Sequence, residues 1–187
     1  MEKEKDCSEK SEIARLRLFV DPQLCLGCKA CEAACAVERG SVSKNRYDAV
    51  HEPITPQARV YVQWDGDASF PLQCRHCDEA RCLEICPAGA LKRDNPEQLV
   101  THDTEKCIGC WMCVMTCSYG VIRPESALRS VEKCDQCFDR ADGPYCKRAC
   151  PTGALQLLGK GEIEEILAKK RAACNYMDIS GCLSYKN

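Results

Sequence analysis

The sequence has few aromatic residues, no long apolar run and no excess of basic residues. Phe, Trp and Tyr make up 6% of the 187 residues, so a core built from large rings would be thin. No segment approaches the roughly 18 consecutive apolar residues of a membrane span. The formal net charge is −2, and no basic stripe with stacking aromatics accompanies it, which argues against a nucleic-acid partner.

The N-terminal run MEKEKDCSEKSE has neither an apolar core nor a twin arginine of the kind that export signals carry. We therefore expect a cytoplasmic protein whose thiols stay reduced, with a disordered tail over residues 1–12. A subunit without its own signal can still cross a membrane attached to a partner that has one.

Cysteine is abundant instead, with 19 residues in the chain. A count this high indicates disulfides, zinc or iron–sulfur clusters. Sixteen of the cysteines form four groups. These groups are Cys25, Cys28, Cys31, Cys35 (one); Cys74, Cys77, Cys82, Cys86 (two); Cys107, Cys110, Cys113, Cys117 (three); and Cys134, Cys137, Cys146, Cys150 (four). Cys7, Cys174 and Cys182 remain, which is too few for a fifth cluster.

The spacing within the groups repeats. Groups one and three read C-x2-C-x2-C-x3-C, while groups two and four end in C-x3-C-P followed by a Gly-Ala-Leu, so the chain is an internal duplication. In such a run three thiolates surround one corner of a cubane, and the fourth cysteine opens a short helix that leads to a different cluster. Pro87 and Pro151 should end that helix in groups two and four. In groups one and three Ala36 and Ser118 follow the fourth cysteine instead, so the backbone there is less constrained.

Zinc is the main alternative to iron. Structural zinc sites use two separated cysteine pairs that close on a single ion, whereas in each group here three residues separate the fourth cysteine from the third. The pattern predicts four [4Fe-4S] clusters held by the same sixteen cysteines through iron. Each oxidised cluster would add roughly −2, giving a loaded charge of about −10.

Short elements are expected between the groups, in an α+β fold. Residues 15–20 and 60–64 read as strands, and residues 90–102 as a hairpin that turns at residues 94–96. Residues 162–177 have helical periodicity, with acidic residues early and basic residues late. Spacing alone leaves the pairing of the groups open: one may pair with two and three with four, as in two consecutive ferredoxins.

The four groups, over residues 15–158, resemble the iron–sulfur subunits of the dimethyl sulfoxide reductase and formate dehydrogenase family. CEAACAVE (31–38), FPLQCRHC (70–77) and KCIGCWMCVM (106–115) more narrowly resemble the electron-transfer subunit of anaerobic CO dehydrogenase. The resemblance implies that the outer groups pair with each other, as do the inner groups. The implied ligand sets are Cys25, Cys28, Cys31, Cys150; Cys134, Cys137, Cys146, Cys35; Cys74, Cys77, Cys82, Cys117; and Cys107, Cys110, Cys113, Cys86.

The resemblance also implies two pseudo-symmetric ferredoxin-like lobes, each with two clusters. Residues 13–69 plus 126–187 would form the outer lobe, with the C-terminal helix, and residues 70–125 the inner lobe. Six cations lie inside or beside the groups and could raise cluster potentials, although each could equally be an ordinary solvated charge. They are Arg75, Arg81, Lys106, Lys133, Lys147 and Arg148. His76 is expected to have a polar, non-ligand role, because group two already has four cysteines.

No nucleophile–base pair, P-loop or dinucleotide fingerprint appears, so we expect an electron-transfer subunit rather than an enzyme. The resemblance implies transfer from a CO dehydrogenase to a hydrogenase or a flavin/NAD(P) oxidoreductase. A formate dehydrogenase or another molybdopterin oxidoreductase is the alternative partner. An iron–sulfur redox sensor or structural cluster protein is a further alternative from another class.

Overall fold

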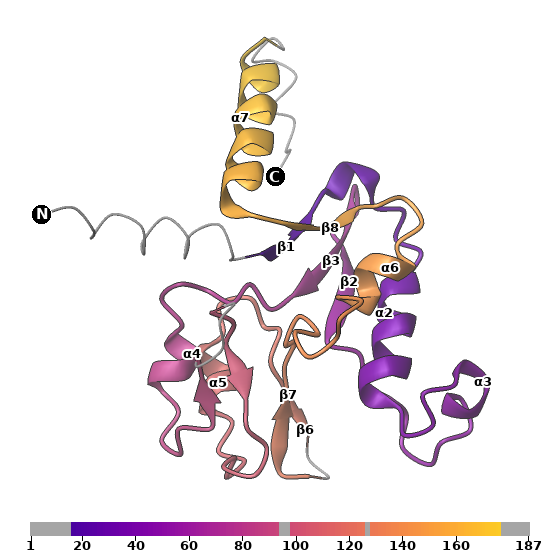
Figure 1. The fold of residues 1–187 in the computed structure, drawn as a ribbon, viewed down its shortest axis with the longest axis vertical. Coiled ribbons are helices and arrows are strands. Elements are labelled where there is room, and N and C mark those ends of the chain that lie inside the picture. The colour runs from indigo at the N-terminus through magenta and orange to yellow at the C-terminus, as the bar shows by residue number, and fades with distance from the viewer. Residues whose placement is uncertain (1–15, 94–97, 126–127, 177–187) are drawn as a thin grey trace, which may run out of the picture.

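The computed structural model describes residues 16–93, 98–125 and 128–176, with side chains described up to residue 172. It is a mixed assembly of short helices and strands, with one longer helix near the C-terminal end (Figure 1). The tail expected over residues 1–12 and the turn at residues 94–96 fall outside this part of the chain. No helix within the described ranges is both long and apolar enough to cross a bilayer.

The strands form four separate antiparallel pairs. The pairs are β1 (Arg17–Val20) with β8 (Leu155–Leu158), β2 (Val60–Trp64) with β3 (Ser69–Gln73), β4 (Leu91–Lys92) with β5 (Thr101–His102), and β6 (Arg123–Glu125) with β7 (Ser130–Glu132). The strands predicted near residues 15–20 and at 60–64 are confirmed as β1 and β2. Because β1 pairs with β8, the segment before group one lies beside the segment after group four.

The helices are short, with one exception. They are η1 (Pro22–Leu24), α2 (Ala30–Cys35), η2 (Ala36–Gly40), α3 (Arg46–Ala49), α4 (Arg81–Glu84), α5 (Met112–Thr116), α6 (Tyr145–Ala149) and α7 (Lys160–Tyr176). The helix predicted from residue 162 is confirmed as α7. Its Ile163 and Ile166 are half-buried, whereas Leu167 is 39% exposed.

The expectation that the fourth cysteine of a group opens a helix is wrong for groups two, three and four. In all four groups a short helix begins at the residue before the third cysteine, and in group one the fourth cysteine also precedes a second helical segment, η2. Cys150 is extended (ψ 112°), which is the conformation that a following proline imposes. Cys35 keeps helical angles and the chain continues into η2, because Ala36 places no such restriction on it. Cys117 is extended without a following proline.

Two separate clusters of buried apolar residues form the core. One draws on both ends of the chain and contains Leu18, Val20, Cys31, Cys35, Val60, Cys146 and Leu155. The other draws on the middle and contains Ala80, Leu91, Val100, Cys113, Ile122 and Val131. Helix α2 packs against α6 in the first region and α4 against α5 in the second. The packing therefore brings group one to group four and group two to group three.

Candidate metal centres

Each cysteine group begins with the same backbone turn. The second residue after the first cysteine has a positive φ in all four groups: Gly27 (65°), His76 (48°), Gly109 (67°) and Gln136 (60°). At two of these turns the backbone N–H points back at the first sulfur, from His76 to Cys74 and from Gln136 to Cys134, each at 3.4 Å. Alternation of right- and left-handed residues creates concavities of N–H groups that suit anionic iron–sulfur centres.

Two glycines at positive φ, Gly109 and Gly89, differ in how much room they leave for a side chain. A Cβ on Gly109 would lie 2.4 Å from the carbonyl oxygen of Arg129, whereas a Cβ on Gly89, also at positive φ, would meet nothing within 4 Å. Group three therefore needs glycine for space as well as for conformation.

We expect Gly109→Ala to reduce the iron bound per chain, because the loop must shift its cysteines to avoid Arg129. Gly89→Ala is the matched control, since it has the same conformational penalty without the collision. Iron content after anaerobic purification and the thermal midpoint measure both effects. Equal iron content and equal thermal midpoints in the two variants would contradict the steric explanation.

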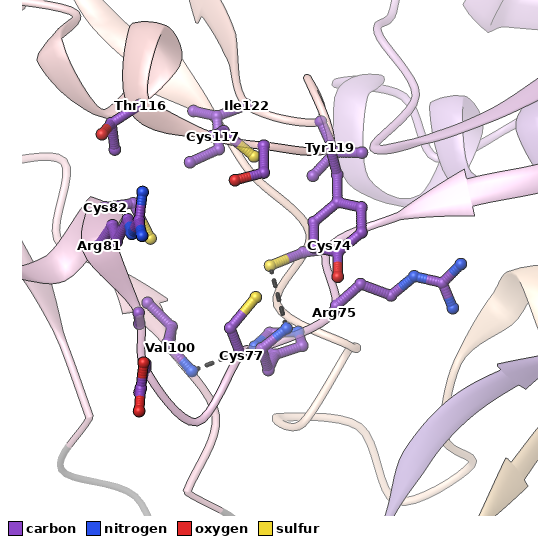
Figure 2. Close-up of a pocket in the computed structure, with 15 residues that line it drawn as sticks. Cys74, Arg75, Cys77, Arg81, Cys82, Val100, Thr116, Cys117, Tyr119 and Ile122 are labelled. Carbon is purple, nitrogen blue, oxygen red and sulfur yellow. Dashed lines mark hydrogen bonds between the residues drawn. The ribbon is translucent and has the colours of Figure 1, made fainter.

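One cavity of about 260 Å³ is lined by four cysteines from two groups. Cys74 and Cys77 come from the loop before α4, Cys82 comes from α4 itself, and Cys117 comes from the end of α5 (Figure 2). Burial raises the pKa of the Cys82 thiol, and the neighbouring thiols of Cys74 and Cys117 add to that rise. Group two thus supplies three sulfurs to this cavity and group three supplies one.

A second cavity has the reciprocal composition. Cys107, Cys110 and Cys113 line it together with Cys86, the last cysteine of group two. Its volume is about 20 Å³, room for about one water molecule. Backbone N–H of Ala90 donates to Cys86 Sγ at 3.3 Å.

The outer groups contain a quartet of buried sulfurs: Cys35, Cys134, Cys137 and Cys146. Burial raises the pKa of Cys134 to about 12, and Cys35 and Cys74 also interact with its thiol. Cys146 likewise has a raised pKa through burial and through the nearby Cys134, Cys35 and Cys137. Group one and group four thus meet at these sulfurs.

Of the other four outer cysteines, Cys31 is also buried, while Cys25 and Cys150 are half-buried. Burial raises the pKa of Cys31 to about 11, with a contribution from Cys150. Although burial acts in the opposite sense, N–H groups around Cys150 and the Thr152 hydroxyl lower the pKa of Cys150. The Ser69 hydroxyl lies 3.6 Å from Cys25 Sγ, and Cys28 is exposed.

This donor set fits iron–sulfur clusters. The sixteen group cysteines are all free thiols, and thiolates are the ligands of cubane clusters. Because burial raises the pKa of seven of them, these thiols stay neutral until metal displaces their protons, so loading releases protons. Within the described ranges, no three His, Cys, Asp or Glu side chains are arranged to hold a single ion.

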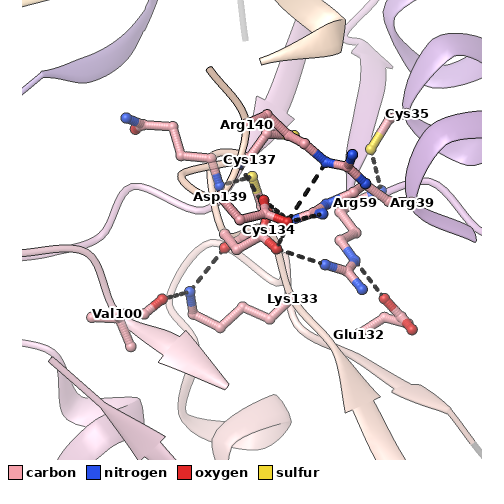
Figure 3. Close-up of polar contacts among 12 residues, drawn as sticks. Cys35, Arg39, Arg59, Val100, Glu132, Lys133, Cys134, Cys137, Asp139 and Arg140 are labelled. Carbon is pink, nitrogen blue, oxygen red and sulfur yellow. Dashed lines mark hydrogen bonds and ion pairs between the residues drawn. The ribbon is translucent and has the colours of Figure 1, made fainter. Parts of the chain in front are cut away.

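A network of ion pairs supports the buried quartet, and the sequence analysis missed it. Arg59 donates to Glu132 (2.6 Å) and to Asp135 (3.1 Å), while its backbone N–H donates to Cys35 Sγ at 3.2 Å (Figure 3). Arg39 pairs with both Asp135 and Asp139. These partners are far apart in the chain, so no local pattern in the sequence could have indicated them.

Of the six cations expected near the groups, Lys133 alone is buried, at 4% exposure, while the other five are exposed. His76 is also buried, at 2%. Its Nδ1 accepts the backbone N–H of Val100 at 3.1 Å. Burial, reinforced by the charge of Lys133, lowers the pKa of His76 to about 2, so the ring is neutral. The non-ligand, polar role expected for His76 is consistent with these contacts.

Comparison with known proteins identifies the type of domain. Residues 67–160 match the 4Fe-4S dicluster domain family. The chain belongs to this family. It is 36% identical over 169 residues to the electron transport protein HydN of Escherichia coli (strain K12), an alignment that covers 82% of this chain and 94% of that protein.

Two further relatives cover most of the chain. An iron-sulfur protein of Rhodospirillum rubrum is 34% identical over 171 residues, 83% of this chain and 88% of that protein. The B subunit of the anaerobic dimethyl sulfoxide reductase of Escherichia coli (strain K12) is 31% identical over 171 residues, 81% of this chain and 75% of that protein. This member of the 4Fe-4S dicluster family is therefore an iron–sulfur electron-transfer protein and not itself a catalytic enzyme.

Proposed function

We propose that the chain relays electrons through four [4Fe-4S] clusters. The ligand sets are Cys25, Cys28, Cys31, Cys150 (site I); Cys35, Cys134, Cys137, Cys146 (site II); Cys74, Cys77, Cys82, Cys117 (site III); and Cys86, Cys107, Cys110, Cys113 (site IV). A bound cubane supplies reversible one-electron transfer at each site. The residues supply spacing, insulation from water and N–H groups directed at sulfur.

The gradient of exposure among the cysteines carries this proposal. Sites I, III and IV each include an exposed cysteine, Cys28, Cys77 and Cys110 respectively, whereas all four cysteines of site II are buried. The thiol of Cys134 in site II interacts with that of Cys74 in site III, so these two sites are neighbours. Electrons would enter at one accessible site, pass through the buried site II and leave at another accessible site.

Sites I and II would form an outer lobe (residues 13–69 plus 126–187) and sites III and IV an inner lobe (residues 70–125). The two separate core clusters support this division. Val131 packs in the second core, so the hairpin of β6 and β7 is shared across the proposed boundary. Lobes with their own cores would keep the sites of each pair at a fixed separation.

Paired cysteine variants test the ligand sets. Loss of one cysteine should cost one cluster, about four irons. Cys74→Ala with Cys117→Ala should therefore still cost about four irons, because both act on site III, while Cys117→Ala with Cys134→Ala should cost about eight. If groups one and two, and groups three and four, were paired as in consecutive ferredoxins, the first double variant would lose about eight irons and the second about four. If each group held a cluster by itself, both double variants would lose about eight irons. Cys174→Ser, outside the four groups, is the control and should cost none. Anaerobic iron analysis provides the measurement.

The electron donor we propose is a CO dehydrogenase, with a hydrogenase or a flavin/NAD(P) oxidoreductase as acceptor. The residues at 31–38, 70–77 and 106–115 support this choice through their resemblance to the electron-transfer subunit of that enzyme. Mixing the oxidised protein with CO dehydrogenase and CO should bleach its visible absorbance within the mixing time of a stopped-flow instrument. No CO-dependent bleaching, with full iron content, would overturn this partner while leaving the relay itself intact.

A molybdopterin oxidoreductase is the second candidate partner. The 31% identity to the B subunit of the anaerobic dimethyl sulfoxide reductase favours it. Anaerobic affinity purification from the native host distinguishes the two: co-elution of a pterin-containing subunit supports this candidate, and co-elution of a CO dehydrogenase supports the first.

A further inference from the structure

Lys133 is a buried ammonium group without a carboxylate. Its Nζ donates to the carbonyl oxygens of Val100 (2.5 Å) and Cys134 (2.9 Å) (Figure 3). No Asp or Glu among the described residues forms an ion pair with it. A buried charge is costly unless something of opposite sign compensates it, and two carbonyl dipoles compensate only part of a full charge. A negatively charged group near Lys133 is therefore needed to compensate the rest of its charge.

The position of Lys133 identifies where that partner would be. Its backbone precedes Cys134 of site II, and its charge acts on the thiol of Cys82 in site III, where it opposes the pKa rise that burial causes. The thiol of Cys74 in site III also contributes electrostatically to the raised pKa of the Cys134 thiol in site II. Lys133 is thus within electrostatic reach of both sites at the point where they are neighbours.

His76 brings an N–H donor without an acceptor to the same place. Because Nδ1 accepts the N–H of Val100, the neutral ring has its proton on Nε2. That Nε2 is buried, and no acceptor for it exists among the described residues. His76 lines the cavity of site III beside Cys74 and Cys77. Val100 connects the two groups, since His76 binds its N–H and Lys133 its carbonyl.

We propose that Lys133 and His76 hold site III at a higher reduction potential than it would otherwise have, so that electrons crossing between the lobes rest there. This inference depends on the ligand sets proposed above. Reduction moves one electron from a neighbouring cluster to site III and adds one negative charge without a proton. A buried cation and an N–H donor both favour the more negative state, and burial leaves them little screened. The two are positioning residues, because their effect is exerted through the cysteine-bound group.

Lys133→Met tests the charge, because methionine fills similar space without it. The full-length, anaerobically reconstituted protein is titrated potentiometrically and followed by electron paramagnetic resonance, with no partner enzyme present. We expect the equilibrium constant for reduction of one cluster to fall at least tenfold. For one electron this is a shift of its midpoint potential by about 59 mV to a more negative value. Lys106→Met is the matched control, since Lys106 is beside group three but 60% exposed, and its midpoints should not move.

Two further variants keep the test decisive. Lys133→Arg retains the charge and should restore the midpoint, while His76→Leu removes the donor and should shift the same signal negatively. An unmoved midpoint in fully loaded Lys133→Met overturns the proposal. If Lys133→Met loses iron, the His76→Leu variant is used to test the proposal, and an unmoved midpoint potential in that variant likewise overturns the proposal. A wild-type chain with far fewer than about sixteen irons refutes the ligand sets instead, so the two failures are distinguishable.

Discussion

Anaerobic removal of iron with a strong chelator is expected to unfold most of this chain, with loss of more than half of its far-ultraviolet circular dichroism. The reason lies in the composition of the two cores. Cys31, Cys35 and Cys146 belong to the first and Cys113 to the second. Strands of two to five residues and, apart from α7, helices of three to six residues are too short to persist alone. In such proteins the free energy of metal binding is the free energy of folding.

Helix α7 provides an internal comparison. It has 17 residues and contains no proposed ligand, so any ordered amides that survive chelation should map to it. Hydrogen exchange read by mass spectrometry would locate the protection, and re-addition of iron and sulfide should restore it in β1 to β8. Native-like protection across β2 and β3 in protein with under one iron would contradict the expectation, because apolar packing alone would then be holding the fold.

Features with a short sequence range could be predicted. The strand at residues 60–64 and the helix from residue 160 have their signal within one segment, in alternation or in 3.6-residue periodicity. The division of sixteen cysteines into four groups was also readable from spacing. The error over where the short helices lie arose because Pro151 was taken to end a helix that begins at Cys150, whereas it restricts Cys150 itself.

Features that depend on tertiary structure could not be predicted. The spacing of the cysteines allows either pairing of the groups, so the predicted pairing came from the family resemblance and not from the spacing, and the packing of α2 on α6 and of α4 on α5 brings the same groups together. Lys133 reads in the sequence like Lys106, yet one is buried and the other is 60% exposed. Burial of a lysine depends on which segments cover it, here residues around Val100.

Asp135→Ala should release iron from site II first, at a rate about a hundredfold above that of the wild type. Asp135 accepts from both Arg39 and Arg59, and these side chains are only 12% and 21% exposed. Without Asp135, Arg59 keeps Glu132, but the half-buried Arg39 keeps only the 46% exposed Asp139, and losing its less exposed partner costs up to about 3 kcal/mol. Arg59 also fixes the backbone N–H that donates to Cys35 Sγ, so a displaced Arg59 disturbs a proposed ligand directly.

Asp139→Ala is the matched control, because Asp139 pairs with the same Arg39 but is 46% exposed. Exposed pairs contribute below about 1 kcal/mol, so its release rate should rise by less than about fivefold. Asp135→Asn tests whether the effect comes from the hydrogen bond with Cys137 and not from the charge of Asp135. Its amide oxygen can still accept the N–H of Cys137, as Asp135 Oδ1 does at 2.9 Å, but it lacks the charge. Release as slow as in Asp139→Ala would assign the effect to that backbone contact, whereas release as fast as in Asp135→Ala would assign it to the buried guanidinium groups.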